Sequence, residues 1–509
     1  MHSFEVPSSK RLLQCGCAIF WCLLAGGPIF GFAALKPVLI NEQIYEDVCY
    51  SNSSTDIMII SNNYNKVVAK CMEQDLKLNF MFTVAAMLTN VTALLIGRIL
   101  DIYGPKVCGL IGSALLYLAC FSFIFSKKVT FIDPYLIGYG LLALGGPFVY
   151  ISSFQLSNSF PKKSGTILAL ISGAFDASSA IFLIYRIIYT NSKGTFTLEK
   201  FFGVYLIVPT FITILEIFIM PTESYHTSPN NTLCINDQEN VGHAISPPSS
   251  GSEITSLLEP SSNPMPHHDS LGDSLMQPYA EEGEEILVVN SGGIFGILHG
   301  YSWQYQLRTY WFILICLFSI IQMLRLNYFV ATIGTQYHYL FGSVQSAEKI
   351  NKFFDIALPL GGLLSIPFIG IFLDHYSTVV VLTWLVAMSL IIGILGLFSD
   401  YTLAVFGICL FVAFRPFFYT TISDYCAKVF GFETFGTVYG TIICISGIFN
   451  YSQTWFDEIT HVTFDMNPFP VNILFIVMTG VIGVIMVLYV TSQAKEYNAR
   501  KIQLDQQSL

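Results

Sequence analysis

The decapeptide Gly97-Arg98-Ile99-Leu100-Asp101-Ile102-Tyr103-Gly104-Pro105-Lys106 lies between two long apolar runs, residues 78–96 and 107–125. Its charged side chains, glycines and proline are not compatible with the hydrocarbon core of a bilayer, where exposed polar groups find no water. We therefore predict a short turn at a membrane surface. A weaker copy, Gly370-Ile371-Phe372-Leu373-Asp374-His375-Tyr376, follows another apolar run later in the chain. Two matching turns indicate a duplicated fold.

The composition is that of a polytopic membrane protein. Of 509 residues, 53% are hydrophobic and 11% are charged, whereas a soluble chain has about 25% charged residues. About 20 apolar residues span a bilayer as a helix. By this measure the sequence predicts twelve spans, at residues 13–39, 76–96, 107–125, 134–155, 166–190, 201–220, 308–331, 352–370, 379–398, 402–423, 434–455 and 470–492. An even number puts both termini on one side, and we expect that side to be the cytosol.

A polar segment separates six spans from the other six. We predict an N-terminal six-helix bundle at 1–221, a disordered cytosolic linker at 222–307 and a C-terminal six-helix bundle at 308–509. The linker holds eleven acidic residues and no Lys or Arg, so it accounts for the net charge of −10, and the rest of the chain is close to neutral. Its composition is too polar to bury a core.

Two short patterns suggest processing and sorting. Cys49 and Cys71 lie in the polar stretch 41–75 with the sequon at Asn52. On a lumenal or exterior face the two thiols can form a disulfide and Asn52 can carry a glycan; the alternative is two free thiols and an unused sequon. The linker contains Glu253, Leu257 and Leu258 in a pattern that resembles an acidic dileucine signal read by sorting adaptors; the alternative is a plain linker.

Few ionisable residues lie at membrane depth, where charges are costly and face the interior of a bundle. The central ones are Asp176, Arg325 and Arg415, while Arg186 is nearer the outer surface and Glu216 and Asp355 lie close to span ends. We take the three central residues as candidates for substrate binding, with the alternative of an ion pair or hydrogen-bonded lock between helices. The further candidates are Asn327 and Tyr328 beside Arg325, Gln155 near the end of the fourth span, and Gly27, in a glycine cluster that lets the first span bend.

The turn at 97–106, with its order Gly-x-x-x-Asp-x-x-Gly-x-Lys, resembles the loop between helices 2 and 3 of the major facilitator superfamily. The resemblance implies two pseudo-symmetric six-helix bundles around a site near the midplane, with the turn holding the halves together. The residues it assigns to this inter-bundle gate are Gly97, Arg98, Asp101, Gly104, Lys106 and Asp374. It also implies that helices 1, 4, 7 and 10 line the cavity, so we expect both arginines, Arg325 and Arg415, to face it.

Three segments are similar to solute-carrier family 43, the L-type-like amino-acid facilitators, and to its fungal relatives. They are 160–179, with Asp176; 325–329, Arg-Leu-Asn-Tyr-Phe; and 414–440, which opens with Phe414-Arg415-Pro416. The resemblance implies facilitated passage of neutral amino acids, large and branched ones first. A zwitterionic ligand needs a cation for its carboxylate, for which an arginine fork is suited, and an acceptor for its ammonium, for which Asp176 is available.

Other functions are weighed against this one. The first alternative is a carrier for nucleobases or monocarboxylates, with or without proton coupling; the second is a membrane sensor that does not transport. The sequence has no phosphate-binding Gly-rich loop, catalytic triad or metal-spaced His and Cys residues, so we expect no enzyme, cofactor or bound metal. We expect a monomer in the vacuolar or plasma membrane, with lipid and a small solute as partners and no nucleic acid.

Overall fold

The computed structural model describes residues 6–51, 58–61, 67–70, 72–128, 132–225, 291–292 and 294–507. In these residues the protein is helical apart from one antiparallel hairpin. The hairpin joins β1 (Met58–Ser61) to β2 (Val67–Lys70), with Met58 opposite Lys70. The fold is therefore the expected all-helical one, with a small hairpin in the first polar loop.

The N-terminal half, residues 6–225, contains a helix or a pair of helices for each predicted span. Its elements are α1 (Ser8–Ala25), η2 (Pro28–Gly31), α2 (Phe32–Asn41), α3 (Asp47–Ser51), α4 (Met72–Val91), α5 (Ala93–Ile124), α6 (Pro134–Ser153), η3 (Phe154–Ser159), η4 (Pro161–Lys163), α7 (Ser164–Ala177), α8 (Ala180–Asn191), α9 (Leu198–Tyr205) and α10 (Ile207–Phe218).

The C-terminal half, residues 291–507, repeats this plan with longer helices. Its elements are α12 (Trp303–Gln306), α13 (Tyr310–Phe341), α14 (Val344–His375), α15 (Thr378–Leu395), α16 (Tyr401–Phe430), α17 (Phe435–Phe449), η5 (Asn450–Ser452), α18 (Gln453–Glu458), η6 (Ile459–Thr463) and α19 (Phe469–Gln507).

The predicted turn lies inside α5, where the chain reverses direction. Gly104 has φ 80° and ψ 172°, a conformation that favours glycine, and Pro105 follows it. The Cys108 thiol donates to the Ile96 carbonyl at 3.7 Å, although twelve residues separate them. A straight helix would place these residues about 18 Å apart. The stretch before Gly104 and the stretch after it are therefore two antiparallel crossings.

In the described residues nine helices are long and apolar enough to cross a membrane, and α14 adds a tenth as a span bent by 44°. One of the nine, Lys77–Ile124, contains the reversal at Gly104 and therefore counts twice. The fifteen-residue helix α17, extended by η5 and α18, supplies the remaining crossing. The helices are thus consistent with the twelve predicted spans.

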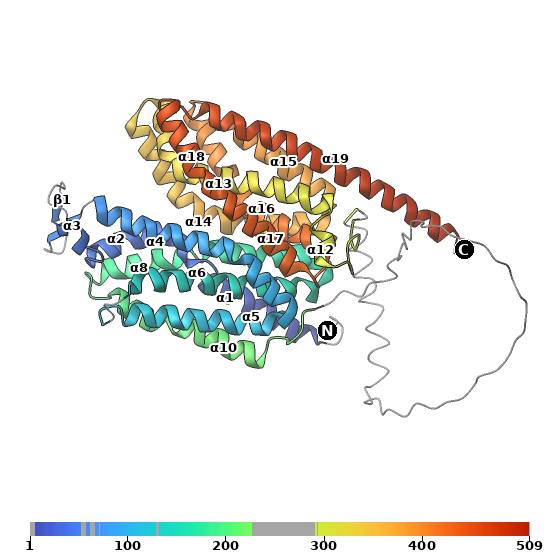
Figure 1. Ribbon diagram of the computed structural model, residues 1–509, viewed down its shortest axis with the longest axis horizontal. Helices are drawn as coiled ribbons and strands as arrows, with labels where there is room; N and C mark the ends of the chain where they lie inside the picture. Colours follow the sequence, from blue (N-terminus) through green and yellow to red (C-terminus); the bar gives the residue numbers. More distant parts are fainter. Residues whose placement is uncertain are drawn as a thin grey trace, which may run out of the picture.

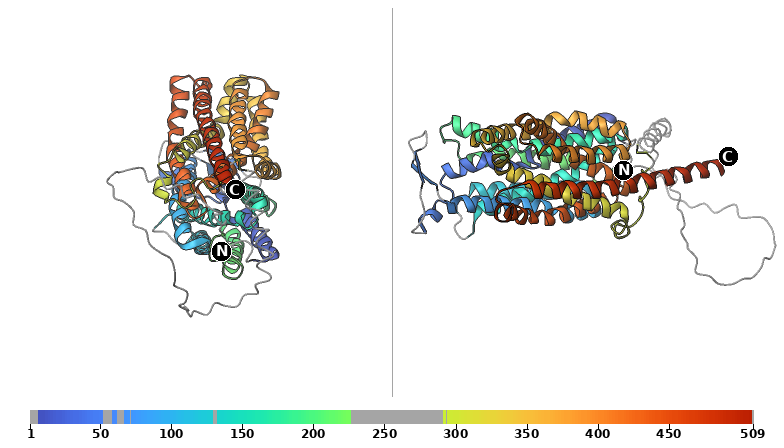
Figure 2. Two further views of the ribbon diagram at one scale, coloured as in Figure 1. Left: turned by 90° about the vertical axis from the view of Figure 1, so that its right-hand side faces the viewer. Right: turned by 90° about the horizontal axis from the view of Figure 1, so that it is seen from above.

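The helices form two groups that run along the same long axis (Figure 1). The helices up to α10 make one group, and α13–α19 make the other. The start of α1 and the end of α19 lie at the same end of the molecule, which we call the terminal end, while β1 and α3 lie at the opposite end (Figures 1 and 2). This placement agrees with an even number of crossings.

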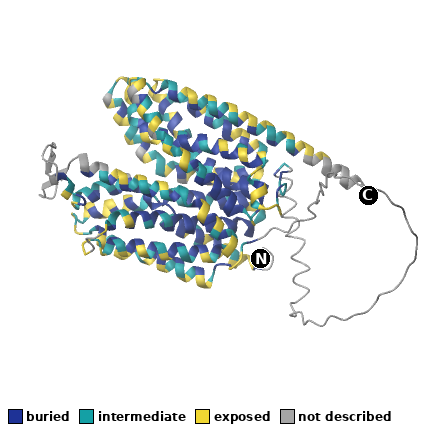
Figure 3. Ribbon diagram, viewed as in Figure 1, coloured by how far each residue is buried: buried dark blue, intermediate teal, exposed yellow. Residues whose placement is uncertain are grey.

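The distribution of buried residues fits a body surrounded by lipid. Exposed residues follow the outer faces of both groups, and buried ones gather where the groups meet near the terminal end (Figure 3). Large apolar side chains such as Phe218, Phe368 and Ile207 are more than two-thirds exposed. Such a surface is unsuited to water and suited to acyl chains.

Residues near both ends of the segment predicted as a linker, 222–307, pack against the helices. Tyr225 is fully buried, and its backbone N–H donates to Oε1 of Gln155 at 3.0 Å. Ile294 is also fully buried, and the N–H of Leu298 donates to the Val429 carbonyl at 3.0 Å. These apolar flanks join the core of the helices. Residues 226–290, with Glu253, Leu257 and Leu258, lie outside the described residues.

Candidate functional site

An ion pair joins the two halves of the molecule at Asp176 and Arg415. Asp176 is the penultimate residue of α7, and Arg415 lies in the middle of α16, just before Pro416. Nη2 of Arg415 is 3.6 Å from Oδ1 of Asp176, and the two side chains are 21% and 11% exposed, respectively. The charges compensate each other in the interior, but the contact is longer than the 2.7–2.9 Å of a direct charge-assisted hydrogen bond. The pair is therefore loose and partly accessible.

A break in the first span shapes the N-terminal side of this pair. The first span is divided between α1 and α2 at Gly26 and Gly27, and the Gly27 N–H donates to Oγ of Ser178 at 2.8 Å, two residues after Asp176. A Cβ at Gly27 would lie 3.0 Å from the ring of Phe175. Glycine therefore allows the break in the first helix to pack directly against the end of α7.

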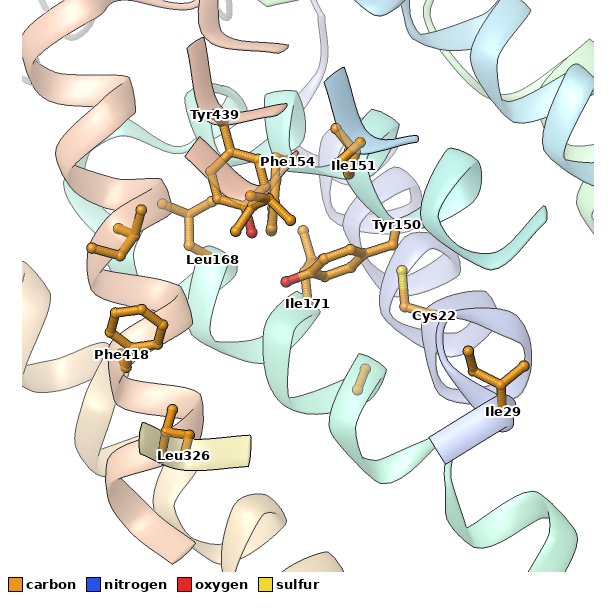
Figure 4. Packing of buried hydrophobic residues seen from close by; sticks show 14 of the residues in the cluster. Cys22, Ile29, Tyr150, Ile151, Phe154, Leu168, Ile171, Leu326, Phe418 and Tyr439 are labelled. Atoms are coloured by element: carbon orange, nitrogen blue, oxygen red, sulfur yellow. The ribbon is translucent and has the colours of Figure 1, made fainter. Parts of the chain in front are cut away.

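Aromatic rings flank the pair. Arg415 lies over Phe30, with 5.9 Å from the guanidinium carbon to the ring centroid. Phe30 contacts Phe175 at 5.9 Å between centroids, and Phe175 contacts Tyr150 at 4.3 Å. Figure 4 shows Tyr150 beside the contact of Phe154 with Tyr439, which joins the two halves. The pair thus has an apolar aromatic wall.

The structure places Arg325 away from this pair, contrary to the expectation that both arginines face one cavity. Nη1 of Arg325 donates to the carbonyl and to Oγ of Ser389 in α15, at 2.7 and 2.8 Å. The Ser389 hydroxyl donates to Gln322, and Gln322 donates to Thr479 in α19 at 3.1 Å. The network joins α13, α15 and α19 of the C-terminal half.

Three weaker candidates also lie elsewhere. Asn327 donates to Asn450 at 3.0 Å, and the hydroxyl of Tyr328 is 2.8 Å from that of Thr460; both contacts are within the C-terminal half. Tyr328 belongs to a small buried cluster with Phe475. Gln155 holds Tyr225 at the terminal end. Of the predicted substrate-binding residues, the structure brings together Asp176, Arg415 and Gly27.

The turn residues meet α17 of the opposite half. Oδ1 of Asp101 accepts from the N–H of Gly436 at 2.9 Å, and Oδ2 accepts from the N–H of Thr437 at 2.7 Å and from the Thr437 hydroxyl. Gly97 packs so closely on Gly436 that a Cβ there would overlap the Gly436 carbonyl. A carboxylate on the first N–H groups of a helix is favourable by hydrogen bonding and by the helix dipole.

Asp374 makes the equivalent contact to α7. Its Oδ1 accepts from the N–H of Gly165 at 2.8 Å, and its Oδ2 accepts from the N–H of Thr166 at 3.2 Å and from the Thr166 hydroxyl. In both contacts the donors belong to a Gly-Thr pair in the first turn of a helix. This repeated dipeptide, Gly165-Thr166 and Gly436-Thr437, is the sequence signal that the motif reading missed.

The other turn residues have separate roles. The guanidinium of Arg98 lies over Trp303, 5.2 Å from the ring centroid, and reaches the C-terminal half. Lys106 instead stays within its own half and donates to the carbonyl of Ile217 at 2.9 Å. Gly104 makes the reversal and lies close to the Thr222 carbonyl.

Cys49 is buried and disulfide-bonded. Cys71 and Asn52 lie outside the described residues. The Cys49–Cys71 pairing and the glycan at Asn52 therefore stay predictions.

Comparisons with known proteins agree with this architecture. Residues 55–450 match the family model described as Major Facilitator Superfamily. "Protein FMP42" of Saccharomyces cerevisiae is 45% identical over 98% of this chain and 99% of its own length. Two animal proteins are similar over part of their length. "Equilibrative nucleobase transporter 1" of Bos taurus is 28% identical over 37% of each chain, and "Large neutral amino acids transporter small subunit 3" of Homo sapiens is 27% identical over 35% of this chain and 32% of its own.

Solved structures show the same fold. The proton:xylose symporter XylE superposes with a TM-score of 0.55 at 12% identity, covering 96% of each chain. The transporter FucP in its outward conformation gives a TM-score of 0.55 at 10% identity, covering 96% of this chain and 99% of its own. The region that matches the family model, residues 55–450, contains the reversal at Gly104, both Gly-Thr contacts and the Asp176–Arg415 pair. The chain is a transporter that belongs to the major facilitator superfamily.

Proposed function

We propose that this transporter carries neutral amino acids, large and branched ones first, by alternating access. The observation that supports the proposal most directly is the loose ion pair between Asp176 and Arg415, which joins the two halves at 3.6 Å.

A zwitterion can replace both partners of this pair at once. Its carboxylate would form an ion pair with the Arg415 guanidinium, and its ammonium would form one with the Asp176 carboxylate. An exchange of this kind leaves no buried charge unpaired, which is the main cost of opening an internal ion pair. A ligand with only one of the two charges would leave either Asp176 or Arg415 uncompensated.

Binding at this position would also act on both halves. Asp176 belongs to the N-terminal half and Arg415 to the C-terminal half, so a ligand between them contacts two bodies that move relative to each other in alternating access. A ligand that fits one relative position of the halves better than another shifts the population towards that position.

The aromatic wall suits an apolar side chain on the substrate. Phe30, Phe175 and Tyr150 offer ring faces beside the charges, and apolar contact adds about 25 cal/mol per Å² of buried area. The similarity to a protein named for large neutral amino acids supports the same class.

The alternative is a nucleobase, or a monocarboxylate. Flat bases stack well on aromatic rings, and a nucleobase transporter is among the similar proteins. A monocarboxylate needs Arg415 but not an ammonium acceptor, so its transport should survive Asp176→Asn. Coupling to protons would appear as alkalinisation outside vesicles on substrate addition. Membership of a transporter superfamily favours all of these over a sensor role.

The direct experiment is uptake of labelled leucine into proteoliposomes. We expect the rate of leucine uptake to be at least about tenfold lower in Arg415→Ala than in the wild type, because one charge-assisted contact is worth about 1.5–3 kcal/mol. Arg186→Ala is the matched control, since Arg186 is an exposed arginine at the surface of α8. Equal uptake by the wild type and Arg415→Ala at equal protein content contradicts the assignment of Arg415.

We further propose that the terminal end faces the cytosol, that the protein is a monomer, and that it resides in the vacuolar or plasma membrane. The central segment would carry the adaptor signal at Glu253, Leu257 and Leu258. Deleting residues 253–258 and following a fluorescent fusion tests the signal, because a plain linker would leave the location unchanged.

A further inference from the structure

The segment at residues 294–306 follows the central stretch and is fastened to the end of α16. The N–H groups of Gly296 and Leu298 donate to the carbonyls of Lys428 and Val429, each at 3.0 Å. The side chain of His299 packs against Gly431, where an added Cβ would lie 3.0 Å from the imidazole ring. We call residues 294–306 the strap.

The strap also holds the helix start that Asp101 contacts. Gln306 is fully buried, and its Nε2 donates to the carbonyls of Leu298 and Phe430 at 2.9 and 3.0 Å. Its Oε1 accepts from the hydroxyl of Thr434 at 2.7 Å. Thr434 directly precedes α17, whose Gly436 and Thr437 donate to Asp101. One amide side chain therefore fixes the position of the α17 N-terminus.

The strap then reaches across to the other half. Trp303 lies one helical turn before Gln306 and is the ring over which the Arg98 guanidinium lies, at 5.2 Å. Arg98 is exposed and lies three residues before Asp101 in α5, so the cation–π contact is about one helical turn from the Asp101 contact. Arg98 and Trp303 come from different halves, so their contact joins the halves at the terminal end.

We propose that Trp303 and Gln306 are positioning residues of the terminal-end gate, and that the strap stabilises the state in which this end is closed. Gln306 presents the first N–H groups of α17 to Asp101, and Trp303 adds a cation–π contact with Arg98. The segment that the composition assigned to a linker thus sets the balance between the two states of the carrier. The inference rests on alternating access and not on the identity of the substrate.

Hydrogen–deuterium exchange of the purified full-length protein tests the proposal without a substrate. In Trp303→Ala we expect exchange at residues 435–441 and 97–103 to rise about two- to fivefold, the range that an exposed cation–π contact supports. Trp303→Phe should restore most of the protection, because a phenyl ring keeps the contact. Tyr305→Ala is the matched control, since Tyr305 is 53% exposed and stacks on Tyr301 of the strap itself.

A double-mutant cycle separates positioning from loss of folding. In an Arg98→Leu background, Trp303→Ala should have no further effect on exchange at 435–441, because the pair is already broken. Gln306→Leu should raise exchange at 435–441 more than at 97–103. If Trp303→Ala leaves exchange at the wild-type level, or if its effect is the same with and without Arg98, the proposal is overturned. If the wild-type protein itself does not take up leucine, that result contradicts the proposed substrate and leaves the proposal for the strap standing.

Discussion

Asp101 and Asp374 make the same three contacts to opposite halves of the molecule. Each carboxylate accepts from two successive backbone N–H groups of a Gly-Thr pair and from the threonine hydroxyl, Asp101 at the start of α17 and Asp374 at the start of α7. The duplicated turns thus form two reciprocal contacts between the halves. Together they join the two halves at the terminal end.

Removing either carboxylate should open this end. Hydrogen bonds to a charged group are worth about 1.5–3 kcal/mol, so Asp101→Ala and Asp374→Ala should each increase opening by about 10- to 150-fold. Hydrogen exchange should rise at both helix starts, α7 and α17, in either variant, because the halves separate as bodies. Asp400→Ala is the control, since Asp400 caps α16 within its own half. If hydrogen exchange rises only at the helix start that the mutated residue contacts, the result contradicts the expectation that the two halves separate as bodies.

The close packing at Gly97 predicts that a single methyl group blocks the gate. In Gly97→Ala the new Cβ would overlap the Gly436 carbonyl, and overpacking of this kind costs about 1–3 kcal/mol. We expect leucine uptake to fall about 5- to 150-fold while the protein stays folded. Gly203→Ala is the matched control, because no atom lies within 4 Å of a Cβ at Gly203. Uptake by Gly97→Ala equal to that of the control contradicts the close approach of α5 and α17.

The two membrane-depth arginines should separate by function. Arg325→Leu removes the donor to the carbonyl and the hydroxyl of Ser389 in α15, and leaving such an acceptor without its donor costs about 1–3 kcal/mol. We expect a lower temperature of thermal unfolding and an unchanged apparent affinity for leucine. Arg415→Gln should lose the response to leucine, and its unfolding temperature should also fall because Asp176 loses its ion-pair partner. If Arg325→Leu has a lower affinity for leucine and normal stability, the result contradicts this prediction and indicates that Arg325 belongs to the binding site.

The sequence predicted the fold well because its signals are local. Apolar length alone locates the spans, and the charged turn with Gly104 marks the reversal of α5. The hydrophobic runs do not predict which neighbouring helices a given side chain contacts. Arg325 was therefore expected at the cavity, whereas it bonds to α15. Asp176 and Arg415 are 239 positions apart in the sequence, and only the packing of the two halves shows that they meet.

Composition alone also does not show that residues near the ends of the predicted linker pack against the helices. An acidic, Ser- and Pro-rich stretch cannot form a core of its own, but its flanks can join an existing one. Tyr225 and Ile294 are both fully buried against the helices. The apolar run Ile294–Leu298 was the available signal, too short to count as a span.

The strap should loosen in acid through His299, which lies outside the membrane-spanning helices. Burial lowers the pKa of His299, while the Ala427 and Lys428 backbone and the Glu433 carboxylate act in the opposite direction. His299 therefore binds a proton less readily when the strap is packed on α16 than when it is released. Protonation below the ordinary histidine pKa of about 6.5 should then weaken the packing of the strap.

Thermal unfolding at pH 7.5 and pH 5.5 checks this expectation. The unfolding temperature of the wild type should fall more between these values than that of His299→Gln. The exposed His338→Gln serves as a control for histidine titration in general. A pH dependence in His299→Gln identical to that of the wild type contradicts the role of His299.

The central claim is that Asp176 and Arg415 bind the two charges of one zwitterion, and ligand-induced thermal stabilisation tests it most directly. The ligands are leucine, 4-methylpentanoate, which lacks the ammonium group, and 3-methylbutylamine, which lacks the carboxylate. We predict that leucine alone stabilises the wild type. Asp176→Asn should gain a response to 4-methylpentanoate, because Arg415 is then free to bind a carboxylate, and Arg415→Gln should not respond to 4-methylpentanoate. Equal stabilisation of the wild type by leucine and by either single-charge analogue, or an unchanged leucine response in both variants, would contradict the claim.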